Sequence, residues 1–240
     1  MTAVLLAAGI SSRLRPLTDA TPKSLLPVGG KPLLQRTLEI LQRFGVQRCI
    51  IVTGYLNEML ESFVRPLPLD LEISFVHNPL FSSTNNNYSL WLSQSALNGD
   101  ALLLLDADIL FDRRILGRLL KSPHADVMVM RRSNELGHEE IKVELNSHGR
   151  VVRIGKEVDP QKAAGESLGI EKFSAATAQK LFATLGRRKD RNEFYEASFQ
   201  EIIDAGAEFY TVESGEFPCI EIDTPEDYAL ADRLATSSLQ

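Results

Sequence analysis

Short apolar runs alternate with amphipathic segments along the first half of the chain. The apolar runs have the length of buried β-strands and lie at 3–7, 49–53, 71–76, 101–105 and 127–130. Between them, apolar residues recur at helical spacing in 33–44, 58–64, 89–97 and 115–120. Strands that alternate with helices in this order predict a mostly parallel sheet with helices on both faces.

The pattern changes in the second half of the chain. Segments 141–145 and 151–154 flank the turn sequence Asn146-Ser147-His148-Gly149 and predict a hairpin. Further strands are expected at 169–173 and 208–212, and helices at 175–185, at 194–205 and from Thr224 onward. We therefore expect an α/β, Rossmann-like fold with a mixed, mostly parallel central sheet flanked by helices. A small antiparallel subregion packs on this sheet, and the whole of 1–240 forms one domain.

Composition and charge narrow the class of protein. The net charge of -6 argues against a nucleic-acid partner, because nucleic-acid binders usually carry a basic surface. No apolar run approaches the ~18 residues of a transmembrane helix, and the N-terminus lacks the basic region of a signal peptide. The two cysteines, Cys49 and Cys219, are far apart and form no CxxC motif. We expect a cytoplasmic protein without a membrane or nucleic-acid partner.

The loop after the first strand is the most informative segment. The strand ends in the small residues Ala7-Ala8-Gly9, where a nucleotide can approach the backbone. The cations Arg13, Arg15 and Lys23 follow, and a triphosphate needs such neutralisation when its α-phosphate is attacked. The loop is neither a Walker A motif nor a GxGxxG fingerprint. The alternative interpretation, a Pro/Gly-rich surface loop with solvated basic residues, has about equal weight from spacing alone.

Two acidic clusters follow apolar runs. Asp106-Ala107-Asp108 comes directly after a buried strand, at the edge of a parallel sheet where ligands bind. Near the C-terminus, Glu221 and Asp223 alternate with apolar residues. Carboxylate oxygens suit Mg²⁺ that bridges phosphates. Alternatively these acids are solvated, and Asp223 only caps the last helix; for the second cluster alone this is the better interpretation.

An unusual polar block runs from Asn78 to Trp91 and reads NPLFSSTNNNYSLW. Amides and hydroxyls both donate and accept hydrogen bonds, which suits the edge of a pyrimidine base or a ribose. An Asn-rich turn that caps a helix is the alternative, and composition alone favours it.

The N-terminal segment resembles a known family. Its sequence AAGISSRLRPLTDATPKSLLPVGGKPLL is similar to the signature of the nucleotidyltransferases that make nucleoside-diphosphate sugars and alcohols, and the match covers roughly the first 35 residues. The resemblance implies that Arg13 and Lys23 are catalytic. It places the nucleotide on Leu6, Ala7, Ala8, Gly9, Ser11 and Ser12. The segment departs from the family at Ser11, where many members have glycine.

Two further segments resemble the cytidylyltransferases that act on phosphocholine, aminoethylphosphonate and related small phosphates. The block around Asn86 and Ser89 matches their N…NN.YS pattern, which implies that both residues contact the nucleotide. The late E-I-D sequence at 221–223 also matches. The resemblance therefore assigns Mg²⁺ to Asp108, Glu221 and Asp223. Asp106 is placed with the nucleotide, and whether it also contacts the metal stays open.

The acceptor side carries a weaker resemblance. It implies that Lys156, Glu166, Tyr195 and Glu196 contact the acceptor, and that 1–135 binds the nucleotide while 136–240 binds the acceptor and completes the metal site. A quaternary ammonium needs aromatic faces or a carboxylate. The segment at 137–140 offers no Trp or Tyr where phosphocholine enzymes tend to have one, so aminoethylphosphonate or a polyol phosphate remains open. Phe194 is expected in the core.

These observations predict a magnesium-dependent cytidylyltransferase. It would transfer CMP from CTP to a small phosphorylated or phosphonate acceptor and release pyrophosphate. One alternative is a sugar-1-phosphate uridylyl- or thymidylyltransferase, and another is a glycosyltransferase whose metal motif is D-x-D. A non-catalytic nucleotide sensor is the third, although the cations and acids that catalysis needs are all present. The oligomeric state stays open.

Overall fold

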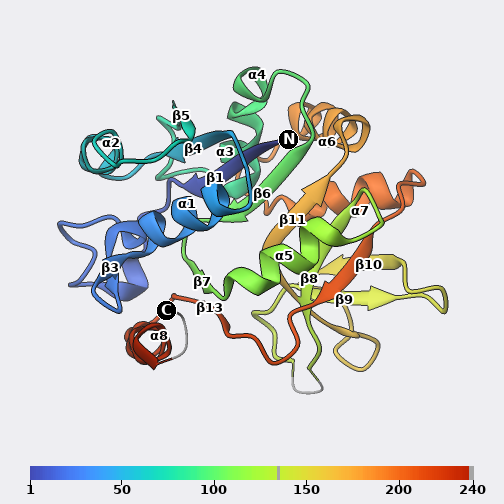
Figure 1. Ribbon diagram of the computed structural model, residues 1–240. Coiled ribbons are helices and arrows are strands. Elements are labelled where there is room, and N and C mark those ends of the chain that lie inside the picture. Colours follow the sequence, from blue (N-terminus) through green and yellow to red (C-terminus); the bar gives the residue numbers. More distant parts are fainter. Residues whose placement is uncertain (134–135, 238–240) are drawn as a thin grey trace.

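The computed structural model describes residues 1–133 and 136–237 (Figure 1). The expected boundary between the two halves, at residue 135, and the last three residues lie outside the described residues. No helix among the described residues is long and apolar enough to cross a membrane.

Four parallel strands form one side of the main sheet. They are β1 (Thr2–Ala7), β4 (Arg48–Thr53), β5 (Glu72–His77) and β6 (Leu102–Asp106). The buried strand β1 lies between β4 and β6, and β5 pairs with β4. These strands are the apolar runs of the sequence, and their parallel order agrees with the alternating pattern. The predicted mixed, mostly parallel sheet is therefore present.

The second half of the chain extends the same sheet. Its strands are β8 (Val127–Arg131), β9 (Lys142–Leu145), β10 (Val151–Gly155), β11 (Gly165–Phe173) and β12 (Tyr210–Glu213). The long strand β11 runs antiparallel to β6, β8 and β9, and β9 forms a hairpin with β10. Strand β12 is parallel to β8. The resulting nine-stranded sheet contains strands from both predicted halves.

Helices cover both faces of this sheet. One apolar cluster contains Leu5 of β1 and the buried sides of α1 (Leu33–Arg43), α2 (Asn57–Val64) and α5 (Arg113–Lys121) (Figure 1). The other apolar cluster contains Val4 of β1. Its helical residues come from α3 (Asn86–Leu92), α4 (Gln94–Leu97), α6 (Ala175–Arg187) and α7 (Glu196–Asp204). Neighbouring residues of β1 thus face opposite clusters, as the period of a strand requires. The last helix, α8 (Pro225–Ser237), packs in a third cluster with Leu14 and Leu110.

Several short elements differ from the sequence-based expectation. The helix expected at 89–97 begins at Asn86 and divides at Ser93, whose hydroxyl donates to the Leu90 carbonyl oxygen at 2.7 Å. Such a local side-chain bond competes with the helix. Two unpredicted two-stranded ribbons are present. They are β2 (Pro27–Val28) with β3 (Lys31–Pro32), and β7 (Ile109–Phe111) with β13 (Cys219–Glu221).

Candidate active site

The β7–β13 ribbon brings the two acidic clusters together. Asp108 precedes β7, Glu221 ends β13, and the antiparallel register pairs Glu221 with Ile109. The Ile222 amide also donates to the Asp108 carbonyl oxygen at 3.1 Å. As a result, carboxylate oxygens of Asp108, Glu221 and Asp223 lie within 4.8 Å of one another. The predicted metal ligands therefore form one cluster, although more than a hundred positions separate them in the chain.

Lys23 lies between two acids of this triad. Its Nζ is 2.7 Å from Asp108 Oδ2 and 2.9 Å from Asp223 Oδ1, and its side chain is only 9% exposed. Burial lowers the pKa of Lys23, but the charges of Asp108 and Asp223 outweigh burial and hold this pKa above its ordinary value. Arg13, whose side chain is 64% exposed, contacts the other oxygen of Asp223 at 2.7 Å. The two predicted catalytic cations thus meet the predicted metal ligands.

The triad has the chemistry of a divalent-cation site. The buried Oδ1 of Asp108 has no hydrogen-bond partner among the described residues. Desolvation, followed by the charges of Asp108 and Asp223, raises the pKa of Glu221 to about 8. A divalent cation would reverse this effect, because it favours the ionised carboxylate. Three carboxylates with one unused buried oxygen fit the oxygen preference of Mg²⁺.

The predicted nucleotide loop begins beside these acids. The register of β1 with β6 aligns Leu6 with Asp106, and the Ala107 amide donates to the Leu6 carbonyl oxygen at 3.2 Å. The backbone of Ala8 is held from the other side, where it accepts from the Tyr55 amide at 3.1 Å. Gly54 permits this approach, because a Cβ there would lie 2.5 Å from the Ala8 carbonyl oxygen. Ala7, Ala8 and Gly9 therefore form the carboxyl edge of the sheet next to the acids.

Ser11 has a strained backbone. Its φ of 54° lies in the left-handed region, which costs a non-glycine residue free energy. This conformation explains why a glycine suits the position in the nucleotidyltransferases that the loop resembles. The Thr18 hydroxyl donates to the Ser11 carbonyl oxygen at 2.8 Å and helps to hold the turn. Ser11 precedes a short 3₁₀ helix, η1 (Ser12–Leu14), which carries Arg13.

A cavity of about 260 Å³ adjoins the triad. Its lining contains eight of the residues predicted from the sequence, namely Arg13, Asn86, Asp106, Lys156, Glu166, Glu196, Glu221 and Asp223. The Nζ of Lys156 is 2.8 Å from Glu139 and 4.9 Å from the centre of the Phe194 ring. Residues from both halves of the chain thus surround one cavity.

Buried acids lie under the far end of this cavity. The hydroxyl of the buried Tyr195 donates to Asp106 Oδ2 at 2.8 Å. Burial and the neighbouring carboxylates raise the pKa of Asp106, and burial raises the pKa of Glu196 to about 7. Burial, together with the charge of Glu196, also raises the pKa of Glu171. One buried oxygen of Glu171 and one of Glu196 have no partner among the described residues. Burial thus favours the neutral form of these acids, and Glu196, which lines the cavity, has one oxygen without a partner among the described residues.

The Asn-rich block connects two elements. Asn87 donates to the carbonyl oxygen of Asp190 at 3.1 Å, and Asn86 accepts from the Tyr195 amide at 2.9 Å. Ser89 is buried, and its hydroxyl accepts from Asn78 at 3.0 Å. Of the two predicted nucleotide contacts in this block, Asn86 lines the cavity, whereas the buried Ser89 is hydrogen-bonded to Asn78 within the block. Its amides thus fix the start of α3 against the segment before α7.

The neighbours Phe194 and Tyr195 are placed contrary to expectation. Phe194 was expected in the core, but it is 41% exposed and lines the cavity. Tyr195, an expected acceptor contact, is 1% exposed and lies under Asp106. The reason is the start of α7 at Glu196, because the two residues precede the helix and helical spacing does not apply to them. Phe194 is thus the aromatic face that the cavity presents.

Two further residues of the cavity shape its wall, and the first of them, Arg131, was not expected from the sequence. Arg131 ends β8, lies 2.5 Å from Glu166 and also donates to the Cys219 carbonyl oxygen at 3.1 Å. A basic residue directly after a buried strand was the available signal. Gly169 has a φ of 64°, and a Cβ there would lie 2.6 Å from Asp106 Oδ2. Glycine at this position leaves the room that the buried carboxylate of Asp106 occupies.

This sheet, its loop and its acid triad define an α/β nucleotidyltransferase. Residues 3–194 match the model of the MobA-like NTP transferase domain, and the chain belongs to this family. The match confirms the family predicted from the N-terminal loop.

Similar proteins include named cytidylyltransferases. The choline-phosphate cytidylyltransferase of Haemophilus influenzae is 36% identical over 154 residues, which cover 64% of this chain and 62% of that relative. The chain thus spans less than two thirds of that relative's length. The 2-aminoethylphosphonate cytidylyltransferase of Lancefieldella rimae is 30% identical over 75% of this chain and 69% of its own length. The solved CTP:phosphocholine cytidylyltransferase from Streptococcus pneumoniae has a TM-score of 0.78 at 25% identity, over 97% of this chain and 98% of that chain. This likeness confirms the predicted α/β fold.

Proposed function

We propose that this protein is a magnesium-dependent cytidylyltransferase. It transfers CMP from CTP to a small phosphate or phosphonate that carries an amino group, and it releases pyrophosphate. The observation that carries the proposal is the position of Lys23, which bridges Asp108 and Asp223 at 2.7 and 2.9 Å beside Glu221. The names of the similar proteins support CTP as the nucleotide. Two buried free thiols, Cys49 and Cys219, support a reducing cytoplasm as its location.

The reaction is an in-line displacement. A phosphate or phosphonate oxygen of the acceptor forms a bond to the α-phosphorus of CTP, and the bond from that phosphorus to the bridging oxygen of pyrophosphate breaks. A deprotonated acceptor oxygen needs no general base. Arg13 and Lys23 neutralise the charge that builds on the phosphates, and the fixed loop orients them. Asp108, Glu221 and Asp223 would hold Mg²⁺, which supplies further neutralisation of phosphate charge when bound.

The acids of the cavity favour a primary amine on the acceptor. Glu196 lines the cavity and has one buried oxygen without a partner among the described residues, and an ammonium group donates hydrogen bonds to such an oxygen. A quaternary ammonium cannot donate these bonds and prefers several aromatic faces. The cavity presents the ring of Phe194, and the charge of Lys156 already lies over that ring. We therefore rank aminoethylphosphonate and phosphoethanolamine above phosphocholine.

Pyrophosphate release tests the proposal directly. CTP, UTP and dTTP are each assayed with aminoethylphosphonate, phosphoethanolamine, phosphocholine, glycerol and inositol phosphates, and glucose-1-phosphate. We expect release with CTP and an amine-bearing acceptor. Release only with UTP or dTTP and glucose-1-phosphate would instead identify a sugar nucleotidyltransferase. Binding of CTP without release for any acceptor would identify a sensor.

Variants of the loop separate catalysis from folding. Arg13→Ala removes an exposed cation, so the fold is expected to survive while the rate of pyrophosphate release falls by about 10²–10³. Lys23→Ala is expected to abolish release, but it also removes the cation that contacts Asp108 and one of the two cations that contact Asp223. Arg15→Ala is the matched control, because Arg15 belongs to the same loop. Among the described residues, its side chain forms an ion pair with the exposed Asp19 at 3.2 Å. Equal activity of Arg13→Ala and Arg15→Ala would overturn the assignment of Arg13.

A further inference from the structure

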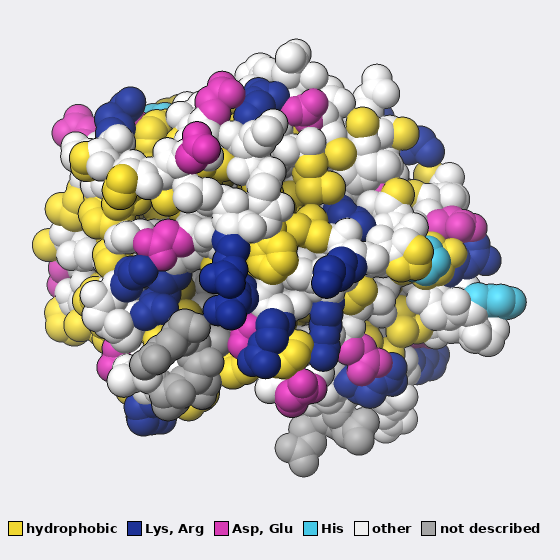
Figure 2. All heavy atoms as spheres, in the orientation of Figure 1, with side chains coloured by type: hydrophobic (Ala, Val, Ile, Leu, Met, Phe, Trp, Pro, Cys, Tyr) yellow, Lys and Arg dark blue, Asp and Glu magenta, His cyan; other side chains and the backbone are white. Residues whose placement is uncertain are grey.

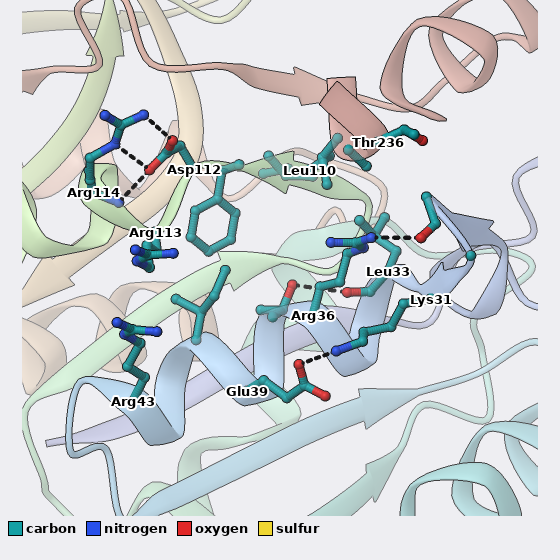
Figure 3. Close-up of a pocket in the computed structure, with 17 residues that line it drawn as sticks. Lys31, Leu33, Arg36, Glu39, Arg43, Leu110, Asp112, Arg113, Arg114 and Thr236 are labelled. Atoms are coloured by element: carbon teal, nitrogen blue, oxygen red, sulfur yellow. Dashed lines mark hydrogen bonds and ion pairs between the residues drawn. The ribbon is translucent and has the colours of Figure 1, made fainter. Parts of the chain in front are cut away.

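A second cavity of about 670 Å³ is lined in part by all three residues of β7 (Figure 3). Its walls come from the turn between β2 and β3, from α1, from β7, from the start of α5 and from the end of α8. Ile109 of β7 borders both cavities. None of the residues assigned to nucleotide, acceptor or metal lines this second cavity. It is therefore distinct from the candidate active site.

The second cavity is strongly cationic. Lys31, Arg36, Arg43, Arg113 and Arg114 line it, against the two acids Glu39 and Asp112, so the lining carries a net charge of +3 in a chain of net charge -6. Figure 2 shows Lys and Arg side chains gathered on this face over α1 and α5. In Figure 3 the Arg43 and Arg113 side chains lie along the same side of the cavity. Such a concentration of one charge in a concave surface attracts anions.

Some of these cations are held in place before any ligand binds. Arg36 donates to the carbonyl oxygens of Val28 at 2.8 Å and Gly29 at 3.1 Å. Arg114 is fixed by two hydrogen bonds to Asp112, at 2.9 and 2.6 Å. Fixed guanidinium groups lose little freedom when they bind phosphate oxygens. Arg43 is exposed at the end of α1 and can turn toward a ligand.

The floor of the cavity is apolar. Leu33, Leu110 and Phe111 line it and are each at most 4% exposed as residues, and Ile40 of α1 lies beside them. An inorganic anion would contact only the cations. A molecule with both phosphates and an organic body would contact the cations and also the apolar floor. The volume is within the range of about 300–1,000 Å³ that is typical of small-molecule sites. The combination fits a nucleotide, with phosphates on the cations and the nucleoside over the floor.

We propose that this cavity is a second nucleotide-binding site. The inference stands independently of the proposed cytidylyl transfer, because it uses none of the same residues. Its position also has a consequence for the first site. Strand β7 begins directly after Asp108, and its residue Leu110 packs with Ile222 between Glu221 and Asp223. A nucleotide on β7 therefore touches the ribbon that carries the acid triad.

Equilibrium binding measured by calorimetry tests the proposal. The probes are CTP, ATP, GTP and, as a phosphate-only ligand, inorganic pyrophosphate. The double variant Lys31→Glu/Arg43→Glu reverses two cations of the cavity, of which Lys31 forms an ion pair with Glu39 at 2.6 Å. We expect it to weaken at least one nucleotide-binding event by about tenfold or more, which is the loss of roughly one charge-assisted contact. The same event is expected to persist in Arg13→Ala, which affects the first site.

Matched controls make the result decisive. Lys162→Glu/Lys180→Glu makes the same change in net charge on exposed residues away from the cavity, and it is expected to bind like the unaltered protein. Thermal unfolding of both double variants verifies that the fold is retained. The proposal is overturned if no nucleotide loses affinity in Lys31→Glu/Arg43→Glu beyond the loss in the control. It is also overturned if pyrophosphate binds there as tightly as every nucleotide, since that outcome means a simple anion site.

Discussion

Glu196 lines the candidate active-site cavity where we propose that the amino group of the acceptor binds. Burial raises the pKa of Glu196 from the ordinary 4.5 to about 7, and the positive charge of Lys156 partly opposes this rise. Asp106 and Glu171 lie close enough for their charges to interact with it, and burial keeps their pKa values high. The charge of Glu196 therefore changes within the physiological pH range.

This assignment predicts a pH-dependent affinity for the acceptor. Glu196 becomes ionised as pH rises from 6 to 8, and the ionised fraction grows about tenfold for a group with a pKa near 7. The ratio of KM for aminoethylphosphonate in Glu196→Gln to that in the unaltered protein should therefore rise by up to about tenfold over this range. Taking the ratio at each pH cancels the titration of the acceptor itself. A ratio independent of pH would show that Glu196 does not contact the amine.

The same group affects stability with a definite sign. A carboxyl whose pKa is raised in the folded state favours folding while it is protonated, and this contribution is lost as pH rises through about 7. When the free energy of unfolding is measured in urea, that of the unaltered protein should fall by about 2–3 kcal/mol relative to that of Glu196→Gln between pH 4.5 and pH 8. Parallel pH profiles for the two proteins would contradict the raised pKa.

At the scale of elements, apolar runs predicted the main strands well. The runs that became β1, β4, β6 and β8 are long enough to carry a pattern, and each is buried on both faces. The β7–β13 ribbon escaped prediction because three residues carry no periodicity, and its two strands are far apart in the chain. The acids could still be assigned, because the resemblance of E-I-D at 221–223 identified them without knowledge of the ribbon.

The same limit explains the misplaced aromatic residues. Phe194 and Tyr195 lie one residue apart, just before α7, and no local pattern distinguishes an exposed ring from a buried one there. Only the tertiary contact decides, because the Tyr195 hydroxyl reaches Asp106 at 2.8 Å. Arg131 was missed for a similar reason, since its partner Glu166 lies on another strand. Partners that are distant in sequence leave no local signal.

The start of α8 holds one acid of the triad in place. Asp227 accepts hydrogen bonds from the amides of Asp223 at 3.2 Å and Thr224 at 2.8 Å, and from the Thr224 hydroxyl at 2.8 Å. The reciprocal bond from the Asp227 amide to the Thr224 hydroxyl closes this turn at 3.2 Å. The turn orients Asp223 toward Lys23 and Arg13, so it links the last helix to the N-terminal loop that carries these two cations.

Removing this turn should affect stability and activity together. Asp227→Ala is expected to cost about 1 kcal/mol of unfolding free energy, as the loss of a helix-capping interaction usually does. The rate of pyrophosphate release should fall as well, because Asp223 is no longer oriented. Glu226→Ala is the matched control, since Glu226 is an exposed acid in the same helical turn. If both variants lost activity equally, the charge of the turn and not its hydrogen bonds would be responsible.

At the scale of the whole molecule, the candidate active site joins segments from the N-terminal, central and C-terminal parts of the chain. Lys23 comes from the N-terminal loop, Asp108 from the centre, and Asp223 from the segment before the last helix. Gly29 and Pro27 of the same N-terminal region contact α8 through Asp232 at 2.8 Å and Tyr228 at 2.7 Å. A ligand that binds the triad therefore holds segments that must separate when the protein unfolds.

Magnesium should for this reason raise the melting temperature of the protein. A ligand at 100 times its Kd contributes about 2.7 kcal/mol, and each kcal/mol shifts the melting temperature by roughly 2–4 °C for a protein of this size. Calorimetric scans with Mg²⁺ and CTP should therefore show an increase of about 5–10 °C over scans with EDTA. Asp108→Asn should lose most of this increase, because it removes one negative charge from the triad and replaces one carboxylate oxygen by an amide NH2, which cannot bind a cation. Asp70→Asn, a change to an exposed acid away from the site, should retain it. An equal increase in both variants would mean that the metal binds elsewhere.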